Sequence, residues 1–213
     1  MIKIKKFTFN PFDENTYLLW DEDTKEGFVI DPGLFDRAEE NEFDNFVKDN
    51  SINLTTILNT HCHIDHILGC NYIKEKYSTV FYVPGKDLPL IEFAKAQAGM
   101  FNLEIDGVPK PDKLFVDDTF IKIGGTDVII LSTPGHSPGE VCFYFEDEKF
   151  CITGDVLFKE GIGRTDLWGA DHNTLISSIK NNLFTLPDDV VIYPGHGDKS
   201  TIGYEKTHNP FLE

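Results

Sequence analysis

Three histidines and one aspartate stand within six positions of the stretch His61-Cys62-His63-Ile64-Asp65-His66. The whole chain has only seven histidines, so their concentration here calls for a chemical reason. Crowded imidazoles make the protonation of each neighbour unfavourable, and a bound cation offsets that repulsion. Neutral imidazole nitrogens and carboxylate oxygens are also donors that zinc and iron(II) accept. The pattern therefore predicts a metal-binding turn rather than a polar surface turn.

Three more apolar, strand-like segments end in a polar turn, and these turns carry His136, Asp155 and His196. A glycine stands directly before each of the three, which lets the backbone turn sharply beside a bound ion. The ends of strands can meet along one edge, so we expect the four turns to supply one set of ligands. The predicted metal ligands are His61, His63, Asp65, His66, His136, Asp155 and His196.

The remaining histidines and the cysteines are expected to do other work. His172 and His208 stand at a predicted helix start and in a terminal turn, which favours surface or capping roles. None of the four cysteines forms a C-x-x-C pair, and without an export signal they are expected to be free thiols in a reducing, cytoplasmic compartment. Cys142 and Cys151 are predicted in the core, and Cys62 is predicted to point away from the ions.

Composition limits the possible function classes. The chain has 213 residues, 40% of them hydrophobic, which is enough for a real core. It has no apolar run near 18 residues, so no membrane span is expected. The formal net charge of −17 disfavours binding to a phosphate backbone, so no nucleic-acid partner is expected. No protein partner is implied.

The hydrophobic patterns predict the elements that position these turns. Residues 15–20 and 27–30 read as a hairpin, and Asp65 stands where the N-cap of a helix over 67–75 would be. Further helices are predicted over 36–49, 88–100 and 173–184, with a loop over 102–113. Further strands are predicted over 1–7, 55–58, 80–83, 120–123, 128–131, 141–145, 150–153 and 190–193. This order favours two β-layers with helices outside them in one compact domain.

The pattern at 61–66 matches the H-x-H-x-D-H motif of the metallo-β-lactamase superfamily, which the chain resembles from its first hairpin to His196. The resemblance implies an α+β sandwich with the four-layer αββα fold, as a single domain over residues 1–213. It also implies how the ligands divide. His61, His63 and His136 would hold one metal ion, Asp65, His66 and His196 would hold the other, and Asp155 would bridge both.

Within the superfamily the chain looks most like short glyoxalase II-like hydrolases, on the segments 154–158, 163–166 and 201–211. This implies hydrolysis of a small acyl thioester such as S-lactoylglutathione. Two divalent cations, zinc with iron or manganese as alternatives, would supply a bridging hydroxide, and Asp65 and Asp155 would be catalytic. Antibiotic-hydrolysing β-lactamases usually carry cysteine where Asp155 stands and lack His66, so that activity is not expected.

Two further residues keep two interpretations each. Arg164 could bind a substrate carboxylate, as a basic residue at the matching point of glyoxalase II does, or it could form a salt bridge with Asp166. Asp31 could hydrogen-bond a ligand histidine or serve only in its turn. Only 17 residues follow His196, so the C-terminal helical domain that binds glutathione in full-length glyoxalase II is expected to be absent, with a weak hold on the thiol portion.

Two rival functions remain open. The related persulfide dioxygenases share the Gly-Arg-Thr-Asp segment and use one iron, whose ligands here would be His61, His136 and Asp155. The presence of Asp65, His66 and His196 fits a two-metal site better. The second rival is a non-enzymatic metal-binding or scaffold protein, which a complete set of seven ligands disfavours.

Overall fold

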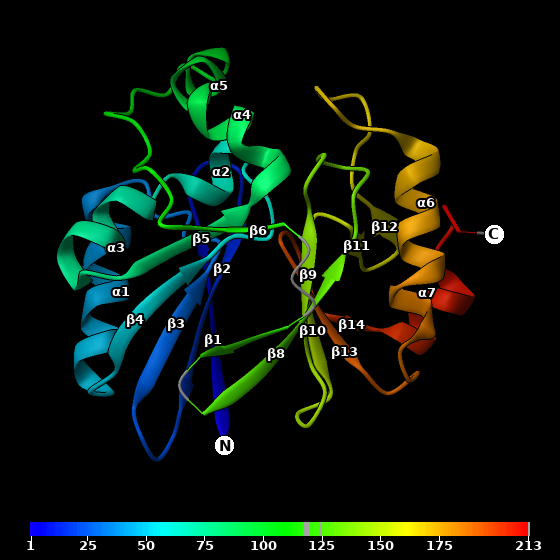
Figure 1. Ribbon diagram of the computed structural model, residues 1–213, viewed down its shortest axis with the longest axis horizontal. Coiled ribbons are helices and arrows are strands. Elements are labelled where there is room, and N and C mark those ends of the chain that lie inside the picture. Colours follow the sequence, from blue (N-terminus) through cyan, green and yellow to red (C-terminus); the bar gives the residue numbers. More distant parts are fainter. Residues whose placement is uncertain (117–119, 124, 213) are drawn as a thin grey trace. The chain divides into compact units, whose positions relative to one another are not determined.

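The computed structural model describes residues 1–116, 120–123 and 125–212. The chain forms two compact units, drawn in Figure 1. Unit 1 comprises Met1–Val116 with Lys122–Thr126, and unit 2 comprises Asp117–Ile121 with Asp127–Glu213. Each unit carries part of the predicted ligand set, so each is described by itself.

The sheet of unit 1 is mixed. Its strands run in the order β1 (Ile2–Phe9), β2 (Glu14–Asp21), β3 (Glu26–Ile30), β4 (Asn53–Leu58), β5 (Val80–Pro84) and β6 (Lys113–Phe115). The first three strands pair antiparallel, and β3 to β6 pair parallel. The carboxyl ends of parallel strands meet at one edge of a sheet. Asp31 after β3 and the histidine turn after β4 therefore lie at the same edge.

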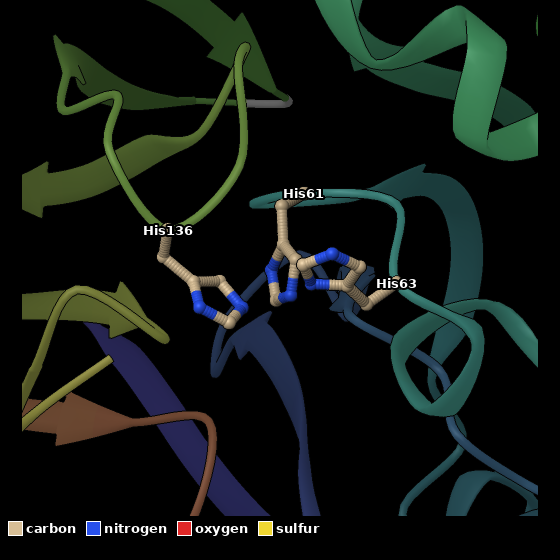
Figure 2. A group of neighbouring side chains, drawn as sticks. All are labelled: His61, His63 and His136. Atoms are coloured by element: carbon tan, nitrogen blue, oxygen red, sulfur yellow. The ribbon is translucent and has the colours of Figure 1, made fainter. Parts of the chain in front are cut away.

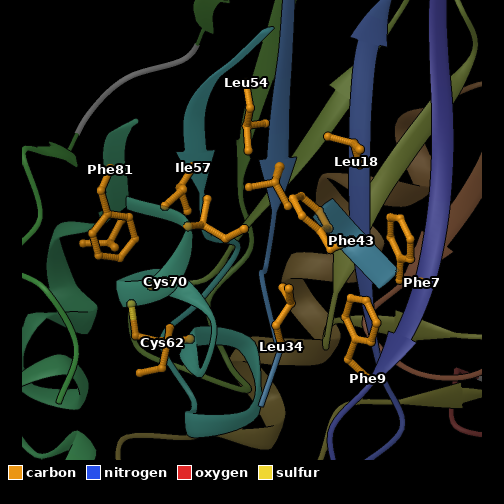
Figure 3. Packing of buried hydrophobic residues seen from close by; sticks show 14 of the residues in the cluster. Phe7, Phe9, Leu18, Leu34, Phe43, Leu54, Ile57, Cys62, Cys70 and Phe81 are labelled. Atoms are coloured by element: carbon orange, nitrogen blue, oxygen red, sulfur yellow. The ribbon is translucent and has the colours of Figure 1, made fainter. Parts of the chain in front are cut away.

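Helices make the crossovers that parallel strands require. They are α1 (Arg37–Asp49), α2 (Ile64–Ile67), α3 (Cys70–Tyr77), the short η1 (Gly85–Asp87), α4 (Leu88–Glu92) and α5 (Ala94–Met100). Asp36 is the N-cap of helix α1, and its side chain accepts hydrogen bonds from the amides of Ala38 and Glu39. The apolar face of α1 buries Phe43 and Val47 in the core of unit 1. Figure 3 shows Phe43 in this core.

Unit 2 is built around the second sheet. Its strands run in the order β14 (Ser200–Thr201), β13 (Val191–Pro194), β10 (Phe150–Gly154), β9 (Val141–Phe145), β8 (Thr126–Ser132) and β7 (Phe120–Ile123). A small hairpin joins β11 (Leu157–Phe158) to β12 (Gly161–Ile162). The helices are α6 (His172–Asn181), the short η2 (Leu183–Thr185) and α7 (Ile202–His208). Leu175 and Ile179 of α6 lie in one hydrophobic cluster with Cys142, Cys151 and Ile192 of the sheet, which confirms the core positions predicted for the two cysteines.

The structure differs from the predicted elements at a few places. Asp65 is not an N-cap, because α2 begins at Ile64 with His63 in that position, and the predicted helix over 67–75 is divided into α2 and α3. The helix predicted over 88–100 is divided at Phe93 into α4 and α5. The short elements β6, β11, β12, β14 and α7 were not predicted. Across the described ranges, no helix combines the length and the apolar character that crossing a membrane requires.

Candidate metal centre

The turn that follows β4 brings three imidazole rings together in unit 1. The ring centroids of His61 and His63 are 4.9 Å apart, and those of His61 and His66 are 4.1 Å apart. Figure 2 shows the rings of His61 and His63 on this turn. His61 and His66 are fully buried. Burial of several polar rings side by side is unfavourable unless their nitrogens are satisfied, which fits a cation-binding role.

Asp31 and Thr60 decide which nitrogen of each ring faces outward. The Thr60 hydroxyl donates to Asp31 Oδ2 at 2.6 Å, so its oxygen accepts from His61 Nδ1 at 3.1 Å. His66 Nδ1 donates to the same carboxylate at 3.2 Å. In a neutral ring with this bond at Nδ1, the lone pair is on Nε2, the atom that would bind an ion. The structure thus shows Asp31 as a hydrogen-bond partner of a predicted ligand histidine, one of the two roles left open for it.

Asp31, His61 and His66 also have donor atoms within 4.8 Å of one another, which could itself suggest a buried metal site. The Asp31 carboxylate, however, already accepts four hydrogen bonds. Its donors are the Thr60 amide, the Thr60 hydroxyl, the Asn59 side chain and His66 Nδ1. A carboxylate whose lone pairs are used in this way supports the ligands and does not join them.

Two further polar residues, Asn10 and Glu14, lie against the histidine turn. Asn10 donates through Nδ2 to the carbonyl oxygens of Gly33 and Asp65, each at 3.0 Å. Glu14 is fully buried, and its Oε1 lies 3.9 Å from His66 Nδ1. Burial raises the pKa of Glu14 well above its usual value, although the nearby His66 opposes the shift.

In unit 2, one carboxylate oxygen lies between two imidazoles. Asp155 Oδ2 is 3.6 Å from His136 Nε2 and 3.6 Å from His196 Nε2. These separations exceed the usual hydrogen-bond range. Donors that share one tetrahedral zinc ion at bonds of about 2.1 Å stand roughly 3.4 Å apart. The geometry of unit 2 therefore fits donors that share ions, with Asp155 common to both histidines.

His136 and Asp155 are held by contacts within unit 2. His136 Nδ1 donates to the Arg164 carbonyl at 2.8 Å, which leaves Nε2 as the donor to a metal ion. The Asp155 amide donates to Oε1 of the buried Glu140 at 2.8 Å. Gly163 is needed where these segments meet, because a Cβ there would stand 1.9 Å from the Asp155 carbonyl oxygen.

The donor set fits divalent metal ions of the zinc and iron type. Each unit offers imidazole nitrogens and a carboxylate within sharing distance, since His66 Nε2 and Asp65 Oδ2 of unit 1 are also 3.6 Å apart. Backbone and side-chain hydrogen bonds fix the tautomers of His61, His66 and His136. Neutral, oriented imidazoles with carboxylates are what such ions bind in proteins.

The other singled-out residues have clear positions. Arg164 forms a two-pronged pair with Asp166, with both N–O distances 2.7 Å, and this contact lowers the pKa of Asp166 to about 2. His172 is exposed at the start of α6, and the ring of His208 stacks on Tyr204 at the surface. Cys62 is buried in the hydrophobic cluster of unit 1, as Figure 3 shows.

Sequence reasoning missed Thr60, Glu14, Glu140 and the Arg164 carbonyl. Thr60 stands next to His61 in the chain, so a hydroxyl adjacent to a ligand was the one local signal that could have found it. The other three act across 15 to 52 positions of sequence, as the pairs Glu140–Asp155, Arg164–His136 and Glu14–His66 show.

Comparisons with known proteins agree with this fold and donor chemistry. The sequence profile of the metallo-beta-lactamase superfamily matches residues 9–196. Hydroxyacylglutathione hydrolase GloC of Haemophilus influenzae is 39% identical over 94% of this chain and 93% of its own. A crystal structure of the BLEG-1 B3 metallo-beta-lactamase is 35% identical, with a TM-score of 0.91 over 99% of both chains. The di-iron-bound form of TTHA1623 is also 35% identical, with a TM-score of 0.85 over 98% of this chain and all of the other.

The fold and the donor set together define a metal-dependent hydrolase. The chain belongs to the metallo-β-lactamase superfamily, and the predicted fold class is confirmed by the profile match and the structural similarity. Mixed sheets with helices make it an α+β protein.

Proposed function

We propose that this protein hydrolyses small acyl thioesters, such as S-lactoylglutathione, at a centre of two divalent metal ions, zinc in the first place. The observation that carries the substrate class is the match to a hydroxyacylglutathione hydrolase over 93% of that relative's length. A relative of about the same length as this chain therefore carries that name. The weak hold on the thiol portion expected from the sequence stays a prediction.

The proposed ligands are the seven residues predicted from the sequence, used as the superfamily implies. The unit 1 part of the proposal is supported by the hydrogen bonds that hold His61 and His66 each by Nδ1. The unit 2 part is supported by Asp155 Oδ2, which is equidistant from His136 and His196. His61, His63 and His136 would hold one ion, Asp65, His66 and His196 would hold the second, and Asp155 would contact both.

When bound, such ions lower the pKa of water from 15.7 toward ~7 and polarise a carbonyl oxygen. The chain's own residues prepare for this chemistry. Thr60 and Asp31 hold the His61 and His66 rings by Nδ1, so Nε2 of each ring is the atom directed at the ions. Asp65 and Asp155 are the proposed catalytic carboxylates, because they would hold the ions that supply this chemistry.

The proposal is tested by metal analysis and a thioester assay on the same preparations of wild type and Asp155→Ala. Wild type reconstituted with zinc should approach two equivalents per chain and hydrolyse S-lactoylglutathione. Asp155→Ala should lose metal and turnover together. A variant that kept both ions and full turnover would refute the bridging role. Wild type that stayed at one iron and consumed oxygen with glutathione persulfide would favour the dioxygenase instead.

Hydrolysis of β-lactam amides is a second candidate, favoured by the 35% identity to a B3 metallo-beta-lactamase over 99% of both chains. A thioester and a β-lactam both offer a carbonyl to the same attacking group. The two substrates are distinguished by comparing kcat/KM for S-lactoylglutathione with kcat/KM for a chromogenic cephalosporin. We expect the thioester to be preferred, because the chain carries Asp155 and His66 where antibiotic-hydrolysing enzymes usually differ.

A further inference from the structure

Cys62, the residue between His61 and His63, is held through both of its backbone groups. Its amide donates to Asp87 Oδ2 at 3.2 Å. Its carbonyl accepts from Gln97 Nε2 at 3.4 Å, and Gln97 also donates to the Leu90 carbonyl at 2.7 Å. The Cys62 side chain is fully buried in the hydrophobic cluster of unit 1 (Figure 3). Residue 62 is thus fixed at three points.

These contacts act on the two peptide groups that carry the ligand histidines. A peptide group is planar, so fixing its N–H or its C=O fixes the plane that ends at the neighbouring Cα. The Cys62 amide belongs to the plane that ends at the Cα of His61. The Cys62 carbonyl belongs to the plane that ends at the Cα of His63. Asp87 and Gln97 therefore hold the backbone positions from which the side chains of His61 and His63 extend.

The position of Asp87 supports a role directed at this turn. Asp87 stands at the N-cap of α4, where an aspartate usually accepts an amide of the first helical turn. Its side chain makes no such capping bond, and its Oδ2 faces the Cys62 amide. The side chain is fully buried, which is unfavourable for a carboxylate unless it has strong hydrogen-bond donors. The helical segment 85–100 carries no predicted ligand, yet it supplies both Asp87 and Gln97.

We infer that Asp87, assisted by Gln97, is a positioning residue that holds the His61-Cys62-His63 turn in its metal-binding geometry. Its hydrogen bond to the Cys62 amide is the contact through which it acts, and it is not one of the proposed ligands. The inference rests on the metal-binding part of the proposed function and is independent of which substrate is hydrolysed.

The test compares zinc affinity in Asp87→Ala, Asp87→Asn and Gln97→Ala, measured by competition with a chromophoric chelator at a temperature where every variant is folded. Removal of a group that orients a ligand typically lowers metal affinity by about 10- to 100-fold, and Asp87→Ala should fall in this range. Gln97→Ala should lose less, because its bond to Cys62 is longer. Asp87→Asn keeps a carbonyl acceptor and should stay within about threefold of wild type.

Asp44→Ala is the matched control in the same unit. Asp44 accepts from Tyr72 at 2.5 Å, from Tyr77 at 2.7 Å and from Lys76, and it contacts no predicted ligand. Its loss should lower the Tm of the metal-free protein without changing zinc affinity. Asp87→Ala that lowered Tm but bound zinc as tightly as wild type would show a structural role only. Asp87→Asn as weak as Asp87→Ala would refute the acceptor role of residue 87.

The same data separate this inference from the proposed function. Wild type that bound zinc but hydrolysed no thioester would refute the proposed substrate and leave the Asp87 comparison intact. Wild type that bound no zinc would overturn both.

Discussion

At the scale of single residues, the metal ligands depend on atoms that are not ligands. His61 is oriented by Thr60, His66 by Asp31, and His136 by the carbonyl of Arg164. In each case the partner accepts a hydrogen bond from Nδ1, so a neutral ring must present Nε2. Three different acceptors therefore produce the same tautomer.

Thr60→Val removes the acceptor of His61 Nδ1 while keeping the shape of the side chain. We expect zinc affinity to fall by about 10- to 100-fold, because the ring is then no longer held in one tautomer. The measurement is chelator competition on the folded protein. Thr79→Val is a suitable control, since Thr79 is also buried in unit 1 and its hydroxyl has no hydrogen-bond partner among the described residues. Equal zinc affinities in the two variants would contradict the role of Thr60.

Arg164 has one role through its backbone carbonyl and another through its side chain, and a substitution can distinguish the two. Its carbonyl holds His136, whereas its guanidinium uses two of five N–H donors on Asp166. Arg164→Ala keeps the carbonyl, so we expect unchanged metal content. If the guanidinium also binds a substrate carboxylate, KM for a glutathione thioester should rise by about tenfold or more with little change in kcat. Unchanged kinetics would leave the Asp166 pair as the whole function of the side chain.

At the scale of elements, the Asp44 network joins α1 to α3. Burial alone would raise the pKa of Asp44, but hydrogen bonds from Lys76, Tyr72 and Tyr77 together lower it. A depressed carboxyl pKa stabilises the folded state above the unfolded pKa of about 3.9, and this contribution is lost as pH falls through the folded value. Asp44→Asn should therefore lower the free energy of unfolding by about 1–3 kcal/mol at pH 7, with a smaller difference near pH 3. Urea unfolding at both pH values measures this, and an equal loss at both would contradict the assignment.

The elements that deliver the ligands were predictable because they are apolar runs that end abruptly in polar turns. Residues 55–58 lie within β4, 150–153 within β10, and 128–131 within β8. The divisions of the helices were not predictable in the same way. No glycine or proline marks the break at Phe93, and the four-residue α2 is too short for a hydrophobic period to place its start. Two-residue strands such as β11 likewise carry no alternation.

In the candidate site, too, some residues were predictable from the sequence and others were not. Its ligands follow from local patterns, because a metal needs particular residue types at close spacing. The residues that hold the ligands in place do not follow from local patterns. Asp87 contacts Cys62 across 25 positions of sequence, and Glu140 contacts Asp155 across 15. A buried carboxylate that accepts a distant backbone amide leaves no spacing signal in one sequence. Asp31 could be named as a candidate partner of a histidine but not assigned to one.

At the scale of the whole molecule, both units contribute proposed ligands, so metal binding should stabilise the folded chain as a whole. A ligand that binds only the folded state adds about 4 kcal/mol of stability at 1,000 times its Kd. For a chain of this size, that corresponds to roughly 8–16 °C in Tm. Zinc-loaded protein should therefore melt well above protein stripped with a chelator, in scanning calorimetry. Asp155→Ala should show a much smaller difference, and a shift as large as that of wild type would argue against its bridging role.

The net charge of −17 makes a separate prediction about substrate binding. A field of this sign opposes the approach of an anionic thioester such as S-lactoylglutathione, and salt screens that repulsion. The Debye length falls from about 30 Å at 0.01 M salt to about 10 Å at 0.1 M. KM for the glutathione thioester should therefore decrease as ionic strength rises over this range, while kcat stays constant. A thioester of an uncharged thiol serves as the control, because its KM should not respond. If KM for the anionic substrate instead increased with salt, then attraction by the bound cations and Arg164 would outweigh the charge of the rest of the molecule.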